Sequence, residues 1–455
     1  MVEPKVTAAL SKFIKDTTYN DLPVEVIKKA KLCLLDFLFV TLGGHLSGLP
    51  AVRIISEYAK EVGGSKEARI LGDGYLLPCE QATMVNSIAS EILELSDGDP
   101  KIIGHAGQAV IPAALAIAER EKASGKNLLT AIVLGYDAMV RIGYAVIPSA
   151  FDRGSSASGC LSSFGAASAA GKILDLTEQE IQSAFGLAAF ASGFRESWTG
   201  TGTMDKDYMV GDAARRGLVA AVLAKRGMSG ASNILEGPRG FCYTLADKVD
   251  LSATLQDLGT KFAIMNQYLK PYPSCRHTHA TIDAVRAILK NRPIEVDDLD
   301  SVTIYLNEHA AAIAVSAPTS YVGVRFSQQF AAAVTFLTGQ ATLNQFSEAM
   351  TKDTNVEKLL GKITIKVDPI LDSAWPEKWS SRVEARLKTG ESIVQQIDYP
   401  KGEVNNPMDE AELMEKYRSL LGGRVTDSWI NGILKKVEGV DKIGDINELT
   451  SILVC

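Results

Sequence analysis

The sequence lacks the ligand spacings and loops that mark several large classes of protein. Its six cysteines form no CxxC pair, which excludes the usual zinc and iron–sulfur frameworks. Cys275, His277 and His279 lie close together in the chain but are short of a complete zinc site, so we expect no metal. No GxxxxGK[ST] segment occurs, so the sequence has no loop of the kind that binds nucleotide phosphates in P-loop proteins.

The sequence also lacks an excess of positive charge and a long hydrophobic run. With 47 Lys and Arg against 54 Asp and Glu, the net charge of −7 argues against a nucleic-acid partner. The apolar run at residues 33–42 contains Asp36 and is too short to cross a bilayer. The N-terminus carries both charge signs and no apolar signal-peptide core. We expect a cytoplasmic protein with free thiols and no membrane partner.

Apolar residues recur at helical spacing through residues 5–265, and no strand alternation of any length is evident there. A first long helix is predicted at residues 24–42, ended by the pair Gly43 and Gly44. Further helices are predicted at residues 81–94, 109–120, 128–143, 163–174, 177–191 and 213–226. The first part of the chain is therefore predicted to be all helical.

After residue 270 the pattern changes. Residues 301–306 and 362–367 alternate as strands do, and residues 382–388 and 392–398 flank a Thr-Gly-Glu turn typical of a hairpin. Helices are predicted at residues 280–291 and 328–337, and again from residue 408 onward. A chain of 455 residues usually forms two or more domains. The predicted fold is mainly α, with a helical domain of residues 1–268 and 403–455 and an α+β insert of residues 269–402.

Residues 270–279, KPYPSCRHTH, have the highest density of charged and reactive side chains in the chain. Two prolines favour a fixed, non-helical backbone, and the cations suit an anion. The segment lies where the helical domain meets the insert, and sites commonly form between domains. We therefore predict that Lys270 acts in catalysis and that Cys275, Arg276, His277 and His279 bind substrate. The alternative is a solvated basic loop.

Three other segments are predicted to face the same pocket. Residues 94–108 carry Asp97 and His105 just before an apolar helix, whose N-terminus favours anions and disfavours imidazolium. Residues 200–217 carry Lys206 ahead of a helix that we expect to open at residues 211–212, and residues 155–167 carry Ser156 among small residues. The alternatives are ordinary helix caps, a solvated lysine and close helix packing.

Such a pocket suits a small polycarboxylate substrate. Lysine and arginine neutralise carboxylates, while a histidine or lysine moves a proton at carbon and the cations stabilise an enolate-like intermediate.

Four segments together resemble the MmgE/PrpD family, in the right order over most of the chain. They are HAGQAVIPAALAIAE at residues 105–119, residues 165–174, GDAARRGLVAAVLAKRG at residues 211–227 and KPYPSCRHTHATIDAV at residues 270–285. The family includes 2-methylcitrate dehydratase, cis-aconitate decarboxylase and iminodisuccinate epimerase. The resemblance implies a large helical domain, a smaller α+β lid, a homodimer and no cofactor. It also implies catalytic roles for His105, Lys206, Lys270 and, as the best match in the acidic loop, Asp97.

The chain departs from the family pattern at three positions. Ser156 and Met209 stand where the family usually has histidine, and Phe330 stands where it usually has tyrosine. We expect a divergent, cofactor-independent lyase of dehydratase or decarboxylase type acting on a di- or tricarboxylate, with His277 or His279 available to replace a lost imidazole. An isomerase, epimerase or ring-forming enzyme is the alternative, followed by a catalytically silent binding protein.

Overall fold

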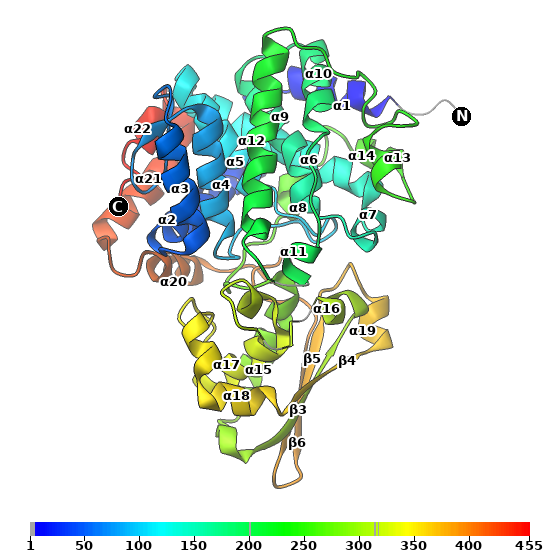
Figure 1. The fold of residues 1–455 in the computed structure, drawn as a ribbon, viewed down its shortest axis with the longest axis vertical. Coiled ribbons are helices and arrows are strands. Elements are labelled where there is room, and N and C mark those ends of the chain that lie inside the picture. The colour runs from blue at the N-terminus through cyan, green and yellow to red at the C-terminus, as the bar shows by residue number, and fades with distance from the viewer. Residues whose placement is uncertain (1–4, 200–201, 314, 317) are drawn as a thin grey trace.

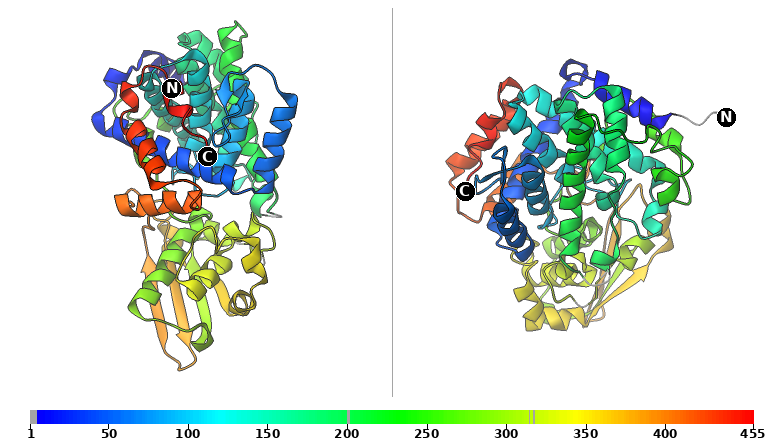
Figure 2. Two further views of the ribbon diagram at one scale, coloured as in Figure 1. Left: turned by 90° about the vertical axis from the view of Figure 1, so that its left-hand side faces the viewer. Right: turned by 45° about the horizontal axis from the view of Figure 1, so that its top comes forward.

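The protein consists of a helical part and a smaller part built on a sheet (Figure 1). The structure is a computed structural model that describes residues 5–199, 202–313, 315–316 and 318–455. The helical part contains elements α1–α14 and α20–α22, and the sheet part contains α15–α19 with β3–β6. In the side view of Figure 2 the two parts stack end to end, and both chain termini lie on the helical part.

The helical part is formed by two stretches of the chain. The first supplies α1 (Val6–Asp16), α2 (Val24–Leu46), α3 (Pro50–Val62), α4 (Cys79–Glu91), α5 (Gly107–Glu121), α6 (Gly125–Val146), α7 (Ser149–Asp152), α8 (Ala157–Cys160), α9 (Ser162–Ile173), α10 (Glu178–Ala188), α11 (Glu196–Thr199), α12 (Asp205–Lys225), α13 (Phe241–Leu245) and α14 (Leu251–Leu255). The second supplies α20 (Glu410–Leu421), α21 (Asp427–Glu438) and α22 (Asn447–Thr450).

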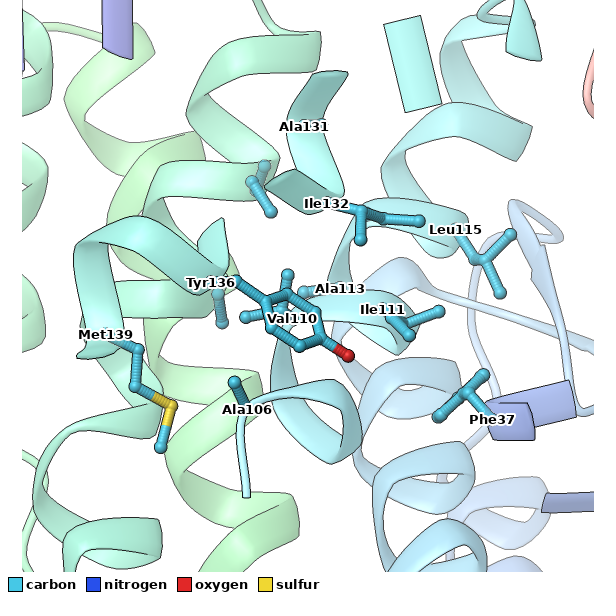
Figure 3. Close-up of a cluster of buried hydrophobic side chains, with 14 of the residues drawn as sticks. Phe37, Ala106, Val110, Ile111, Ala113, Leu115, Ala131, Ile132, Tyr136 and Met139 are labelled. Carbon is cyan, nitrogen blue, oxygen red and sulfur yellow. The ribbon is translucent and has the colours of Figure 1, made fainter. Parts of the chain in front are cut away.

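Helices α5 and α6 are buried along almost their whole length and form the centre of this part. Figure 3 shows Val110 and Ile111 of α5 beside Ile132 and Tyr136 of α6. The alanine-rich sequence of α5 lets neighbouring helices approach closely, because small side chains leave room between the backbones. Burial of α5 and α6 fixes the loop between α4 and α5, which carries Asp97 and His105.

The sheet part has four strands in the order β4-β3-β5-β6. Strand β3 (Leu299–Leu306) pairs in parallel with β4 (Ile363–Val367) and antiparallel with β5 (Ser381–Leu387), which forms the predicted hairpin with β6 (Ser392–Ile397). Its helices are α15 (His279–Asn291), α16 (Glu308–Ala312), α17 (Gln328–Thr338), α18 (Thr354–Leu360) and α19 (Pro369–Ser373). Helices α15, α17 and α18 lie on one side of the sheet (Figure 1).

Each part has its own cluster of buried apolar side chains. Tyr321, Val322 and Phe326 belong to the cluster of the helical part, although the chain around them builds the sheet part. These three residues therefore help to hold the sheet part against the helices. The domain limits drawn at residues 268 and 402 stay predictions.

The predicted fold class, mainly α with an α+β portion, is confirmed, and three local predictions are wrong. Helix α2 continues past Gly43 and Gly44 to Leu46. Residue 44 has to be glycine because a Cβ there would lie 1.9 Å from the carbonyl oxygen of Ala89 in α4. The glycine pair therefore serves close helix packing, not helix termination. Helix α12 begins at Asp205, six residues before the predicted start at residue 211. Two short strands, β1 (Ala68–Arg69) and β2 (Leu76–Leu77), occur where none was expected.

Among the described residues, α6 is long and apolar enough to cross a membrane, and the pair α2 and α3, bent by 89°, passes the same test jointly. The apolar window of α6 is 94% buried inside the protein. A core helix of a globular protein has this length and composition too, and α6 is packed as one.

Candidate active site

One cavity contains five of the nine predicted site residues. His105, Ser156 and Lys206 come from the helical part, and Cys275 and His277 come from the predicted basic segment. The remaining lining is Glu91, Glu94, Ile103, Phe151, Ala157, Ser158, Met209, Ile313 and Phe326. The tertiary structure thus brings together residues from four of the predicted segments.

His105 presents one ring nitrogen as a base. Its Nδ1 lies 2.6 Å from the backbone carbonyl oxygen of Asp97, which can only accept, so Nδ1 carries the hydrogen and Nε2 keeps its lone pair. Burial, reinforced by the nearby charge of Lys270, lowers the pKa of His105 to about 4. The imidazole is therefore neutral at neutral pH, as expected, but burial is the main cause.

Lys206 lies in the first turn of α12 and forms ion pairs with both Glu91 and Glu94. Its ammonium also lies 5.3 Å from the centre of the Phe326 ring. Burial lowers the pKa of Lys206 to about 7, although the charge of Asp207 opposes the shift. A lysine with such a pKa exchanges its proton near neutral pH, as acid–base catalysis requires.

Lys270 lies behind the cavity wall, fully buried, with its Nζ 2.7 Å from Glu94 Oε2. Glu94 therefore bridges Lys206 and Lys270, and it does so from a left-handed backbone conformation with φ of 54°. The sequence predicted a pocket dominated by cations. That prediction is wrong for these two lysines, because Glu91 and Glu94 match their charges.

The carboxylate of Asp97 is not directed at His105. Oδ1 accepts a hydrogen bond from the backbone N–H of Gly107 at 3.1 Å, and Oδ2 accepts one from the Tyr136 hydroxyl at 2.5 Å. Burial raises the pKa of Asp97 to about 6. Asp97 thus caps the start of α5 with its side chain and orients His105 with its backbone carbonyl.

His277 faces the cavity and stacks on Trp379 of the sheet part, with ring centroids 4.4 Å apart. Burial lowers the pKa of His277 to about 3. Its Nε2 is buried without a hydrogen-bond partner among the described residues. Cys275 also lines the cavity, and burial raises the pKa of its thiol to about 11, so the thiol stays protonated.

Arg276 and His279 do not line the cavity. They connect the two places where the chain passes between the helical part and the sheet part, near residues 276 and 403. Arg276 pairs with Glu403 at 2.6 Å and donates to His279 Nδ1 at 3.0 Å. The His279 Nε2–H in turn donates to the Ser274 carbonyl at 3.2 Å. Both nitrogens of His279 are therefore used inside the fold, and the expectation that it could replace a cavity imidazole is wrong.

The three departures from the family pattern fall in different environments. Ser156 and Met209 both line the cavity. Phe330 is fully buried in the core of the sheet part, with its ring centroid 6.1 Å from that of Phe346. Met209 and Ser156 therefore shape the cavity, whereas Phe330 packs the sheet part.

Comparison with known sequences agrees with these features. The model of the MmgE/PrpD N-terminal domain matches residues 8–254, and that of the MmgE/PrpD C-terminal domain matches residues 272–436. The chain belongs to the MmgE/PrpD family.

Curated relatives of this MmgE/PrpD protein share its full length. A protein named cis-aconitate decarboxylase from Aspergillus terreus is 27% identical, over 99% of this chain and 96% of its own. The Homo sapiens protein of that name is 24% identical, over 100% and 95%. The Aspergillus oryzae cis-aconitate decarboxylase-like protein oryM is also 24% identical, over 99% and 98%.

Sequence reasoning about this MmgE/PrpD protein missed the carboxylates of the cavity. Glu91 and Glu94 interrupt the apolar stretch IASEILEL at residues 88–95, and a charge inside a buried helix end needs a partner. That interruption was the available signal. Sequence reasoning also missed the buried Arg325. Its guanidinium donates a hydrogen bond to the Ile92 carbonyl oxygen. Its backbone carbonyl oxygen accepts a hydrogen bond from the Cys275 N–H, with the two atoms 2.8 Å apart.

Proposed function

We propose that this protein is a lyase of the decarboxylase or dehydratase type that acts on a small carboxylate. One observation carries the proposal: His105 and Lys206 line the same buried cavity, the first with a free basic nitrogen and the second with a pKa lowered to about 7. Such a pair can move a proton at carbon and stabilise negative charge on an enolate oxygen. No step of this chemistry needs a cofactor.

In the decarboxylase form of the reaction, the breaking C–C bond leaves its electron pair on the substrate as an enolate. CO₂ is released, the Lys206 ammonium stabilises the enolate oxygen, and its proton is then transferred to the carbon that lost CO₂. In the dehydratase form, His105 Nε2 takes a proton from carbon, a carbon–carbon double bond forms, and the hydroxyl group takes a proton from the Lys206 ammonium and leaves as water. The names of the curated relatives support the decarboxylase form and a di- or tricarboxylate substrate.

The second candidate is an isomerase, epimerase or ring-forming enzyme on the same site. It is favoured by Ser156 and Met209, which line the cavity where the family pattern has histidines, because one-proton chemistry needs fewer acid–base groups. Incubation of candidate substrates in deuterated water separates the two. Deuterium entry at carbon without release of CO₂ or water favours the isomerase, and binding without any exchange favours a silent binding protein.

The test of the lyase is turnover of cis-aconitate and related di- and tricarboxylates, with CO₂ release as the measure of decarboxylation and the appearance of a carbon–carbon double bond as the measure of dehydration. His105→Ala and Lys206→Ala should each lower kcat by about 10²-fold or more. His45→Ala is the matched control, since His45 is a half-buried histidine of α2 outside the cavity lining. Full activity in either cavity variant removes that residue from the mechanism. Homodimer formation and a cytoplasmic location stay predictions.

A further inference from the structure

Asp207 is a buried carboxylate that the proposed mechanism does not use. It follows Lys206 in the first turn of α12, is 2% exposed and does not line the cavity. Its Oδ2 accepts a hydrogen bond from the Tyr321 hydroxyl at 2.6 Å. A carboxylate removed from water is costly unless charges and hydrogen bonds compensate for the lost hydration. Burial of a carboxylate at this position therefore indicates a task beside Lys206.

Asp205 provides the comparison within the same turn of α12. It precedes Lys206 as Asp207 follows it, and the positive end of the helix favours a carboxylate at either position. Asp205 is exposed and accepts a hydrogen bond from the neighbouring Thr203 hydroxyl. The helix start alone therefore accounts for Asp205, but it does not account for the burial of Asp207 or for its bond to the sheet part.

The sheet part holds the start of α12 at two points. The Ser320 hydroxyl donates to the Gly202 carbonyl oxygen at 3.1 Å, just before the helix. The next residue, Tyr321, donates to Asp207 inside the first turn. Both bonds run from the sheet part to the helical part, so the position of Lys206 depends on contact between the two.

Asp207 also balances the buried charges around Lys206. Arg325 of the sheet part is a further buried cation, beside the two lysines that pair with Glu91 and Glu94. Asp207 is a further buried carboxylate, and its charge offsets that of Arg325. Loss of the Asp207 charge would leave the group with an excess of positive charge, which disfavours the ammonium form of lysine. The other titratable groups that face Lys206 are Glu91, Glu94, His105, Lys270, Cys275 and Arg325.

The charge of Asp207 acts on Lys206 in a defined direction. Burial lowers the pKa of Lys206 to about 7, and the negative charge of Asp207 opposes that shift. Burial likewise raises the pKa of Asp207, and the positive charge of Lys206 opposes that rise. Removal of the carboxylate should therefore lower the pKa of Lys206 further.

We propose that Asp207 is a positioning residue for Lys206, held by the Tyr321 hydroxyl of the sheet part so that its charge keeps the lysine protonated for catalysis. Tyr321 acts through Asp207 and not on the substrate. This inference rests on the proposed function and deepens it, because it assigns the residues that fix the charge and the place of the proposed catalytic lysine. The activity of Lys206 then depends on contact between the helical part and the sheet part.

Asp207→Asn separates charge from position, because asparagine still accepts a hydrogen bond from Tyr321. The upper limit of the pH profile of kcat/KM should fall by about 1 pH unit, as expected for the loss of a nearby opposite charge. The value of kcat/KM should therefore drop about tenfold at about pH 8 and change little at about pH 5. Asp205→Asn is the matched control and should leave the limit unchanged. Asp207→Ser takes the place of the asparagine variant if circular dichroism shows that the latter is misfolded.

Tyr321→Phe tests the hold on Asp207. Loss of the hydroxyl frees the carboxylate and the turn that carries Lys206, so kcat/KM should fall by about tenfold. In the Asp207→Ala background the same substitution should have no further effect, because the tyrosine then has nothing to hold. Tyr305→Phe is the control, since Tyr305 of β3 donates to Glu384 outside the cavity lining.

A measurement without substrate separates this inference from the proposed function. In protein labelled with ¹³C in its lysines, the side-chain signal of Lys206 is assigned by its loss in Lys206→Arg. By nuclear magnetic resonance this signal should titrate near pH 7 in the wild type, and about 1 pH unit lower in Asp207→Asn.

Three outcomes are decisive. An unshifted Lys206 signal in Asp207→Asn, or an equal shift in Asp205→Asn, overturns the inference and leaves the proposed function intact. Additive losses from Tyr321→Phe and Asp207→Ala overturn the part assigned to Tyr321. A wild-type protein that turns over no carboxylate, yet shows the shift of the Lys206 signal, overturns the proposed lyase and not the link between Asp207 and Lys206.

Discussion

The basic segment at residues 270–279 is conspicuous in the sequence but places few of its charged side chains in the cavity. The opposite holds for residues 91–94 at the end of α4. The segment holds four cationic or imidazole-bearing residues and stands out in the sequence. In the structure Arg276 and His279 are bonded within the fold, and Lys270 lies behind the cavity wall. Residues 91–94 are inconspicuous in sequence, yet Glu91 and Glu94 both line the cavity and hold Lys206.

This difference shows that chemical density in the chain does not measure availability at a site. A side chain is available only if its polar atoms are left free by its neighbours in space. Arg276 uses its guanidinium on Glu403, on the Lys401 carbonyl and on the Tyr268 ring. Glu91 lies in a mostly apolar stretch of the sequence, and one of its oxygens has no hydrogen-bond partner among the described residues.

The strongest test of this comparison is Arg276→Ala. Removing the arginine leaves Glu403 without its partner at the two chain crossings, and breaking a buried pair in this way costs about 3–5 kcal/mol. Urea denaturation should show this loss, while the activity of the folded protein falls much less than in Lys206→Ala. The double variant with Glu403→Gln should recover part of the stability. A variant that keeps its stability but loses activity would place Arg276 in the site instead.

The second test displaces residues 91–94 by disturbing the contact between α4 and α12. A Cβ on Gly211 of α12 would lie 2.6 Å from Ile88 of α4, so Gly211→Ala should push the two helices apart and shift Lys206 from Glu91. We expect a loss of about 1–3 kcal/mol in unfolding free energy and a lower kcat.

The control for that test is Gly432→Ala. Gly432 lies inside α21 with open space around it, so alanine should stabilise the protein by up to about 1 kcal/mol. Thermal and urea melts of both variants check the prediction. Equal stability of the two variants would show that contact between α4 and α12 is not tight at residue 211.

The smallest expected effect is on the pH dependence of kcat/KM, which should show the titration of His105 at its lower limit and that of Lys206 at its upper limit. His105 becomes a base above its pKa of about 4, and Lys206 loses its ammonium as pH rises through about 7. The profile of kcat/KM should therefore be flat between these values and fall about tenfold per pH unit beyond each.

Lys206→Arg tests the assignment of the upper limit. A guanidinium stays charged throughout this pH range, so any activity that remains should no longer decline near pH 7. An unchanged decline in the variant would assign the upper limit to another group.

Much of the fold followed from the pattern of apolar residues. The helix with the Thr177 and Glu180 capping box and the hairpin at residues 381–397 lie where the sequence predicted them. Gly43 and Gly44 misled the prediction, because a glycine that ends a helix and one that admits a neighbouring backbone look alike in sequence. The start of α12 was missed for a related reason, since a glycine lies inside its first turns.

The sequence by itself determined the fold class and the family, and it named His105 and Lys206, because helical periodicity and an ordered set of motifs survive without coordinates. Only the tertiary structure decided which charges remain free. Lys206 is close in space to Glu91, 115 residues away in sequence, and Lys270 to Glu94, 176 residues away. Pairing over such separations depends on how helices pack. The cavity therefore became a balanced site with one unpaired carboxylate oxygen, in place of the predicted cluster of cations.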